Sequence, residues 1–314
     1  MNKTVEPKTL SGGLRVLPSK SASHRAVMMA AMAEGKTQLE PLQLSKDISA
    51  TLACAQALGL TRGAAIAESE TEGFVRAEIW GGGEGAKRAL RELDCGESGS
   101  TLRFFIPLAL DGRGPVRLVG HGRLMQRPLT VYEKLFAPLG VSWNQEGDAL
   151  TVEGALQSGR FELPGDVSSQ FITGLLFALP LLEGESTLTV TGPRESVGYV
   201  NLTLRALARF GVVPAPEESG WRMAPQPYHG PSWVQVEGDW SNAAPWLCLG
   251  ALGGESVTVK GMDPASLQGD KAVCDVLAQM GARLHITGDR VTAFRGPLRP
   301  TQIDARDIPD LVPV

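Results

Sequence analysis

The chain has 314 residues, of which 43% are hydrophobic and 20% are charged, and its formal net charge is −4 at pH 7. This length exceeds what one hydrophobic core usually organises, so two domains are expected. The mildly acidic balance excludes a general attraction to nucleic acid or to an anionic membrane, and any basic site must be a local cluster. No apolar run reaches the roughly 18 residues that a transmembrane helix needs, and we expect no signal peptide.

A turn rich in serine and small residues recurs along the chain about every 70 residues, each time before an apolar, helix-like segment. The four turns begin at Lys20, Gly96, Gly165 and Gly238. Such residues are favoured at helix starts, where they satisfy or expose the unpaired N–H groups of the first turn. A helix start also carries partial positive charge, which suits phosphate or carboxylate. The repeats therefore predict an anion site built from helix starts, or else four ordinary caps beside incidental basic residues.

Each repeat also contains a second predicted helix that ends at a glycine, which permits the left-handed conformation that closes a helix. These glycines are Gly59, Gly140, Gly211 and Gly281. Runs of β-forming residues lie at 74–80, 149–152, 188–190, 233–236 and 257–259. Each repeat is thus predicted as strand, helix, strand, helix and further strand. Pro107 and Pro180 fall inside apolar segments and should kink or stop those helices.

The cysteines and the absence of several known motifs limit the kinds of reaction that the protein could catalyse. Cys54, Cys95, Cys248 and Cys274 show no C-x-x-C spacing and are expected to be buried, reduced thiols, which favours a cytoplasmic protein. The sequence has no nucleotide-triphosphate loop, no dinucleotide fingerprint and no paired-histidine metal motif. We therefore expect no nucleotide, dinucleotide or metal site. A mechanism built on phosphate clamps and carboxylates is what remains.

Ordered motifs over the whole chain resemble the 5-enolpyruvylshikimate-3-phosphate synthase family. They are Lys20-Ser21-x-Ser23-His24-Arg25-Ala26, Gly96-x-Ser98-Gly99-Ser100-Thr101-x-Arg103, Arg123-Leu124-x-Gln126-Arg127-Pro128, Gly165-Asp166-Val167-Ser168-Ser169-Gln170-Phe171, Glu237-Gly238-Asp239-Trp240-Ser241, Gln268-Gly269-Asp270 and Asp304-x-x-Asp307-Ile308-Pro309-Asp310. The resemblance implies a two-domain inside-out α/β barrel of βαβαββ repeats, the enolpyruvyl transferase fold, with the second half of one domain missing. Residues 19–227 would form a complete three-repeat domain, and residues 1–18 and 228–314 an incomplete second domain.

The resemblance also implies a reaction of the shikimate pathway, in aromatic amino acid biosynthesis. In this reaction the carboxyvinyl group of phosphoenolpyruvate passes to the 5-hydroxyl of shikimate 3-phosphate by addition and elimination, without a metal or an organic cofactor, and phosphate is released. Both substrates are polyanions, which explains the demand for cationic and hydroxyl donors. The implied partners are these small molecules alone, with no nucleic acid and no membrane, and the full-length protein is expected to be a monomer.

The positions of the family motifs imply a role for individual residues of this chain. The expected contacts of shikimate 3-phosphate are Lys20, Ser21, Arg25, Ser168, Ser169, Ser196, Tyr199 and Asp310. Those of phosphoenolpyruvate are Lys20, Gly99, Arg127 and Gln170, with Lys20 between the two substrates. Arg103 and Asp47 are expected to support these residues, and Asp47 could also cap the helix that follows Ser45-Lys46. Lys20 and Asp310 are the expected catalytic residues. Asp310 would accept a proton from the sugar hydroxyl, although the residues alone also allow it to be a helix cap after Pro309.

The sequence departs from the family pattern in three places. Glu97 stands where many relatives have an amide, and Ser196 and Tyr199 lack the Lys-Pro pair often found between them. The chain also stops at Val314, where relatives continue with further repeats that hold a catalytic glutamate and basic residues. We therefore expect a fragment that is inactive alone and that exposes apolar faces of its incomplete domain.

Two other functions are compatible with parts of this pattern. A UDP-N-acetylglucosamine enolpyruvyl transferase shares the fold but has Lys-Asn at the first motif and a reactive cysteine in a loop, whereas this chain has Lys20-Ser21 and no cysteine between Gly120 and Pro128. A catalytically inactive repeat protein that binds phosphorylated metabolites is the other alternative. Such a protein would be expected to lose Asp310 or Lys20, and both are present.

Overall fold

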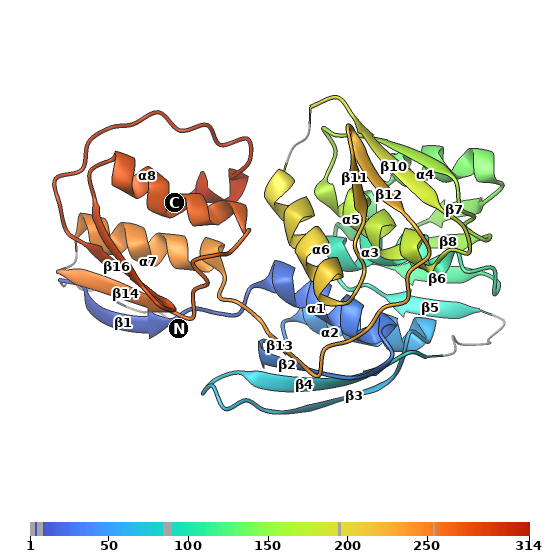
Figure 1. Cartoon of the computed structure of the whole chain (residues 1–314), viewed down its shortest axis with the longest axis horizontal. Helices are drawn as coiled ribbons and strands as arrows, with labels where there is room; N and C mark the ends of the chain where they lie inside the picture. Colours follow the sequence, from blue (N-terminus) through green and yellow to red (C-terminus); the bar gives the residue numbers. More distant parts are fainter. Residues whose placement is uncertain (1–3, 5–8, 84–89, 194–195, 254) are drawn as a thin grey trace. The chain divides into compact units, whose positions relative to one another are not determined.

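The computed structural model describes residues 4, 9–83, 90–193, 196–253 and 255–314 (Figure 1). The chain forms two compact units, residues 20–236 and residues 1–19 with 237–314. Both are built from the same module of four strands and two helices. None of the helices in the described ranges is both long and apolar enough to cross a membrane.

The first unit contains three modules. The first module consists of α1 (Lys20–Met32), β2 (Gly35–Leu42), α2 (Lys46–Leu58), β3 (Thr61–Glu68), β4 (Val75–Gly81) and β13 (Trp233–Gln235). The second consists of β5 (Arg91–Asp94), α3 (Gly99–Ala109), β6 (Val116–Val119), α4 (Thr130–Phe136), β7 (Ser142–Glu146) and β8 (Ala149–Glu153). The third consists of β9 (Arg160–Pro164), α5 (Ser169–Ala178), β10 (Ser186–Thr191), α6 (Val197–Arg209), β11 (Ala215–Glu217) and β12 (Gly220–Met223).

The second unit is one such module, with β1 (Ser11–Arg15), α7 (Trp240–Leu252), β14 (Ser256–Lys260), α8 (Val273–Gln279), β15 (Arg283–Thr287) and β16 (Arg290–Phe294). All four sheets share one strand order, β13-β2-β4-β3, β5-β6-β8-β7, β9-β10-β12-β11 and β1-β14-β16-β15. In each, the first pair is parallel and the other two pairs are antiparallel. The predicted repeat is therefore confirmed in all four modules.

The first module completes its sheet with a distant piece of chain. Strand β13 pairs in parallel with β2, from Trp233 opposite Gln38 to Gln235 opposite Glu40. The unit consequently extends to residue 236, beyond the boundary at 227 that the family resemblance implied. A short strand whose partner lies far away in sequence carries no local sign of the sheet to which it belongs.

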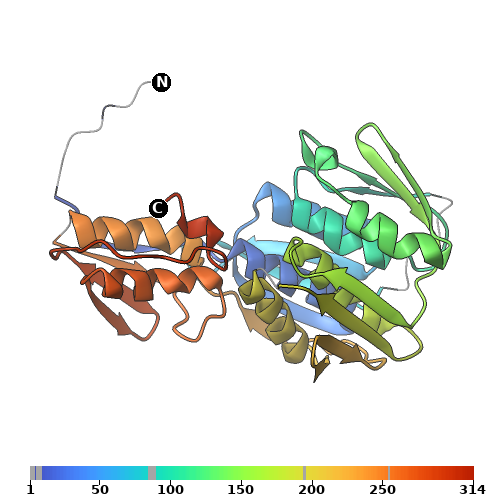
Figure 2. The same cartoon turned by 90° about the horizontal axis from the view of Figure 1, so that it is seen from above.

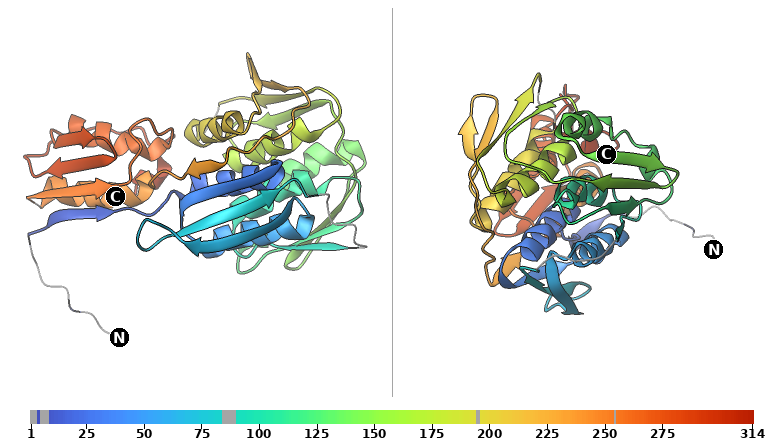
Figure 3. Two further views of the ribbon diagram at one scale, coloured as in Figure 1. Left: turned by 60° about the horizontal axis from the view of Figure 1, so that its bottom comes forward. Right: turned by 90° about the vertical axis from the view of Figure 1, so that its right-hand side faces the viewer.

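In the three-module unit the sheets lie outside and the helices inside (Figures 2 and 3). Helices α1, α3 and α5 are buried on nearly all sides, and their residues dominate the common core. Helices that are apolar all round must lie in such a centre. The predicted helix ends are confirmed, since Gly59, Gly140, Gly211 and Gly281 all have positive φ.

The two prolines act near helix ends. Helix α5 stops at Ala178, and Pro180 lies in the 3₁₀ helix η3 (Leu179–Leu181) that follows. Pro107 lies within the last turn of α3, which ends at Ala109. Both outcomes follow from the missing N–H and the bulk of the proline ring.

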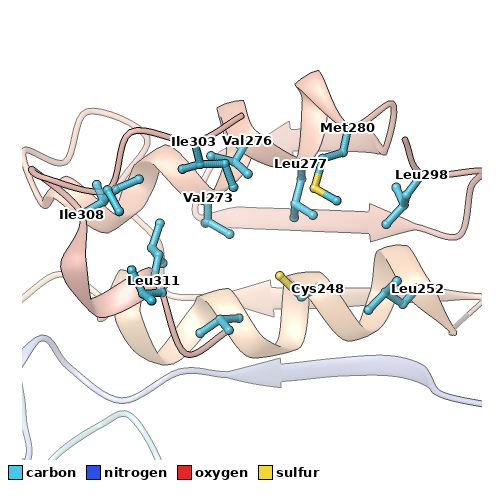
Figure 4. A pocket seen from close by; sticks show the side chains of 13 residues that line it. Cys248, Leu252, Val273, Val276, Leu277, Met280, Leu298, Ile303, Ile308 and Leu311 are labelled. Atoms are coloured by element: carbon cyan, nitrogen blue, oxygen red, sulfur yellow. The ribbon is translucent and has the colours of Figure 1, made fainter. Parts of the chain in front are cut away.

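The single-module unit has an apolar pocket of about 430 Å³ on its helical side (Figure 4). Cys248 and Leu252 of α7 face Leu277 of α8 and Met280, which follows α8, across it, and the C-terminal segment contributes side chains that include Ile308. Leu252 is 64% exposed. Exposed apolar faces were expected for this part of the chain, and the side chains around this pocket are apolar.

Binding of an apolar probe tests whether this pocket is accessible in solution. An apolar fluorescent probe such as ANS should bind the protein, and Leu252→Glu should reduce its fluorescence by about half or more, because a carboxylate would border the pocket. Leu139→Glu is the matched control, since Leu139 is an exposed leucine of the other unit. Equal losses in the two variants would show that the probe does not report on this pocket.

Candidate functional site

Three helix starts of the three-module unit carry the motifs that the sequence singled out. The first turns of α1, α3 and α5 contain no acidic residue. Ser98 caps α3 by accepting from the Thr101 N–H at 3.2 Å, and Ser168 caps α5 by accepting from the Gln170 N–H at 3.4 Å. No acidic side chain in these first turns compensates the partial positive charge of the helix starts. The helix starts therefore favour an anionic ligand.

The starts of α3 and α5 meet at Gly99. A Cβ atom at Gly99 would lie 2.7 Å from Arg127 Nη1, 3.3 Å from Arg103 Nη1 and 3.5 Å from Gln170 Oε1. Two guanidinium groups and one amide therefore gather around a residue without a side chain. The structure brings together three predicted contacts of phosphoenolpyruvate (Gly99, Arg127 and Gln170) and the predicted supporting residue Arg103.

The amide of Gln170 is held in one orientation. Its Oε1 accepts from Arg103 Nη1 at 2.6 Å, and its Nε2 donates to Ser100 Oγ at 2.9 Å. One hydrogen of Nε2 is used in this way, so the second can point to a ligand. Ser100 was not predicted as a functional residue, although its place in the first turn of α3, beside Gly99, was an available sign.

Arg103 is buried against aromatic side chains. Its guanidinium lies 4.9 Å from the ring centroid of Phe171. Burial, and then repulsion by Arg127, hold the pKa of Arg103 below its ordinary value. An anion placed between the two guanidinium groups would relieve this repulsion.

Arg25 is more deeply buried than its predicted role suggests. Its side chain donates to Thr203 Oγ1 at 2.9 Å, to the Ser21 carbonyl at 2.8 Å and to the Tyr199 carbonyl at 2.9 Å. Burial lowers the pKa of Arg25 to about 10, so the guanidinium stays charged at neutral pH. Arg25 thereby ties the first turn of α6, which carries Tyr199, to α1. Thr203 was missed, because its burial depends on the packing of α6 against α1, which the sequence does not show.

Lys20 and Asp47 form an ion pair between the first turns of α1 and α2, with Nζ 3.1 Å from Oδ2. The suggestion that Asp47 caps α2 is wrong. Ser45 is the cap, and its Oγ accepts from the Ile48 N–H at 3.3 Å. Asp47 lies too far into the helix to cap it and instead holds Lys20 at the surface, where the lysine remains accessible.

The other predicted contacts of shikimate 3-phosphate within this unit lie at helix starts. Ser21 is in the first turn of α1, and Ser168 and Ser169 begin α5. Ser196 precedes α6 with φ 55° and ψ 40°, a left-handed conformation that is uncommon for a residue other than glycine. Such strain is often found at ligand sites.

Asp310 lies in the other unit, in the 3₁₀ helix η5 (Pro309–Leu311), where Ile308 and not Asp310 holds the capping position. The simple capping interpretation is therefore wrong. Asp310 is close enough to Asp270 to help burial raise the pKa of that carboxyl, and Ser241 Oγ donates to Asp270. No three His, Cys, Asp or Glu residues in the described ranges are arranged to hold a metal ion.

Comparison with known proteins identifies relatives over the whole chain. Residues 5–314 match the family model of EPSP synthase (3-phosphoshikimate 1-carboxyvinyltransferase). A 3-phosphoshikimate 1-carboxyvinyltransferase of Clostridium novyi is 37% identical over 320 residues, covering 100% of this chain and 72% of the relative. The enzyme of the same name from Clostridium beijerinckii is 39% identical over 325 residues, with the same shares covered.

Solved structures agree on the fold. The EPSP synthase of Acinetobacter baumannii matches with a TM-score of 0.76 at 23% identity, covering 98% of this chain and 71% of that one. The enolpyruvyl transferase NikO of Streptomyces tendae matches with a TM-score of 0.65 at 20% identity, covering 93% and 68%. The predicted enolpyruvyl transferase fold is confirmed.

His24 should make the free energy of unfolding depend on pH. Burial lowers its pKa to about 3, so the imidazole is neutral in the folded protein at pH 7. The unfolded chain takes up a proton below pH 6.5 or so, and stability should therefore fall as the pH drops from about 6.5 towards 3. Between pH 7 and pH 5 the expected loss from this residue is roughly 2 kcal/mol.

Urea unfolding at pH 7, 6 and 5 measures this loss. His24→Asn should remove that part of the pH dependence, because an amide does not titrate in this range. His229→Asn should leave it unchanged, since His229 is an exposed histidine of the same unit. A wild-type slope that persists in His24→Asn would contradict the assignment.

Proposed function

The chain belongs to the EPSP synthase family, and we propose that it transfers the carboxyvinyl group of phosphoenolpyruvate to the 5-hydroxyl of shikimate 3-phosphate, releasing inorganic phosphate. The observation that carries this proposal is the convergence of Arg103, Arg127 and Gln170 on Gly99. That arrangement offers charge-assisted donors to one anion at a place where no side chain intrudes. Small polyanionic substrates fit it, and the family match specifies which ones.

The chemistry has two halves. In the first, the substrate 5-hydroxyl adds to C2 of phosphoenolpyruvate, its proton leaves to a base, and C3 takes up a proton to give a tetrahedral ketal. In the second, C3 loses a proton, the C2–O bond to phosphate breaks, and the carboxyvinyl ether forms. Preorganised cationic donors lower the cost of the charge that develops on phosphate and carboxylate in these steps.

Within this scheme the residues have separate roles. Gly99, Arg127 and Gln170 would bind phosphoenolpyruvate, with Arg103 orienting the Gln170 amide. Ser21, Arg25, Ser168, Ser169, Ser196 and Tyr199 would bind or frame shikimate 3-phosphate. Lys20 would exchange its contact with Asp47 for contacts with both substrates, and Asp310 would accept the proton of the 5-hydroxyl.

Three further proposals concern the setting of the protein. Residues 20–236 form a complete domain, because their three modules enclose one common core. The protein acts in the cytoplasm, a proposal supported by four cysteines without a disulfide, of which Cys54, Cys95 and Cys274 are buried. The full-length protein is a monomer that takes small-molecule substrates and no nucleic acid, and the acidic net charge supports the absence of nucleic acid.

Isothermal titration tests the substrate assignment. Shikimate 3-phosphate should bind the purified protein, because most of its proposed contacts lie in residues 20–236. Phosphoenolpyruvate should then bind more tightly in its presence than alone. Shikimate without the phosphate is the matched ligand control and should bind far more weakly. The absence of any heat with shikimate 3-phosphate would refute the assignment.

The variant Arg127→Ala should affect the binding of one substrate and not the other. Loss of a charge-assisted contact of about 1.5 to 3 kcal/mol should weaken phosphoenolpyruvate binding by about 10- to 150-fold, with less than a twofold effect on shikimate 3-phosphate. Arg123→Ala, in an exposed arginine on the same loop, is the control and should change neither affinity. Equal losses for both ligands in Arg127→Ala would contradict the division of roles.

A further inference from the structure

A chain of buried hydrogen bonds crosses three helices just beneath the candidate site. His24 of α1, Thr51 of α2 and Thr101 of α3 are each at most 1% exposed. His24 Nδ1 lies 2.8 Å from Thr51 Oγ1, and Thr51 Oγ1 lies 2.8 Å from Thr101 Oγ1. Polar side chains are costly in a core unless they are paired, so this arrangement links the three helices in one register.

Two members of this chain, Thr101 and Thr51, contact helix starts that carry site residues. Thr101 Oγ1 donates to Ser98 Oγ at 2.7 Å, and Ser98 caps α3 directly before Gly99. Thr51 Oγ1 lies 3.0 Å from the Asp47 carbonyl, in the first turn of α2. Thr51 therefore stands between the Lys20–Asp47 pair on one side and the start of α3 on the other.

Counting hydrogens fixes the direction of these bonds. The Thr51 hydroxyl has one hydrogen, and the Asp47 carbonyl can only accept it. Because Thr101 donates to Ser98, the contact between Thr51 and Thr101 also requires Thr51 as donor. The Thr51 hydrogen is thus shared between Asp47 and Thr101, and His24 must donate from Nδ1.

The surroundings of His24 Nε2 support the same position of the proton. Nε2 is buried and has no hydrogen-bond partner in the part of the chain that the structure describes. A buried N–H without a partner is rarer than a buried acceptor without one. The proton therefore belongs on Nδ1, and Nε2 carries a lone pair that faces the core.

We propose that Thr51 is a positioning residue, which accepts from neutral His24 and uses its single hydroxyl hydrogen to hold the starts of α2 and α3 in register. This inference rests on the proposed function, because it assigns Thr51 a role in placing Gly99 and Arg103 for phosphoenolpyruvate. Thr51 touches no substrate. Its effect is transmitted through the Ser98 cap and the first turn of α3.

Thr51→Val tests the proposal, because valine keeps the shape of threonine and removes the hydroxyl. Amide hydrogen exchange over residues 99–103 should become at least about tenfold faster, since the start of α3 loses its link to α2. Phosphoenolpyruvate affinity should fall about five- to tenfold, with less than a twofold change for shikimate 3-phosphate. Thr51→Ser restores the hydroxyl and should restore both quantities.

Thr37→Val is the matched control, because Thr37 is a buried threonine of β2 in the same unit. It should leave exchange at 99–103 unchanged. The ¹⁵N spectrum of the imidazole gives an independent readout, in which His24 should show a protonated Nδ1 and an unprotonated Nε2 in the wild type and in Thr51→Ser.

Three outcomes would overturn the proposal: a proton on Nε2, unchanged exchange in Thr51→Val, or equal losses for both ligands. If the wild-type protein binds neither ligand, the proposed function fails. The exchange and imidazole measurements still decide the role of Thr51 in that case.

Discussion

Positive charge concentrated at the starts of α1, α3 and α5 is the constraint on which the rest of the unit depends. The first turns of these helices hold no acidic residue, and burial, followed by repulsion from Arg127, lowers the pKa of Arg103. A small chain would relax by turning these groups outward. Here the large apolar core beneath them opposes such a relaxation, so the site stays charged and ready for an anion.

The repeated module supplies the rigidity that this arrangement needs. Each module has the same strand order and a second helix closed by a glycine with positive φ. Helices α1, α3 and α5 are consequently presented in the same way from three sheets. Side chains such as Arg25 then connect neighbouring modules through specific hydrogen bonds. The apolar centre provides most of the stability, while the polar contacts near the helix starts determine the register.

Features that depend on local chain chemistry were predictable from the sequence. Gly59 and Gly281 close helices because of their own backbone freedom, and the turns at Gly96 and Gly165 precede helices because serine and glycine favour starts. The family motifs also selected Gly99, Arg127 and Gln170, which the structure brings together.

Features that depend on distant neighbours were not predictable in the same way. Nothing within residues 233–235 indicates pairing with β2. The hydrogen bonds of buried Arg25 involve threonines on α5 and α6, which lie far from it in the sequence. The hydrogen bonds of Thr51 likewise join three helices, and the sequence does not show which residues of these helices lie side by side.

The central claim is that Gly99 lacks a side chain so that Arg127 can reach the anion. A double-mutant cycle with Gly99→Ala and Arg127→Ala, measured as phosphoenolpyruvate affinity with shikimate 3-phosphate saturating, tests it most directly. A methyl group at Gly99 would displace Arg127 Nη1, so Gly99→Ala should cost little once Arg127 is already alanine, and the two effects should overlap strongly. Fully additive losses would contradict the account, because they would show that the glycine and the arginine act on the ligand independently.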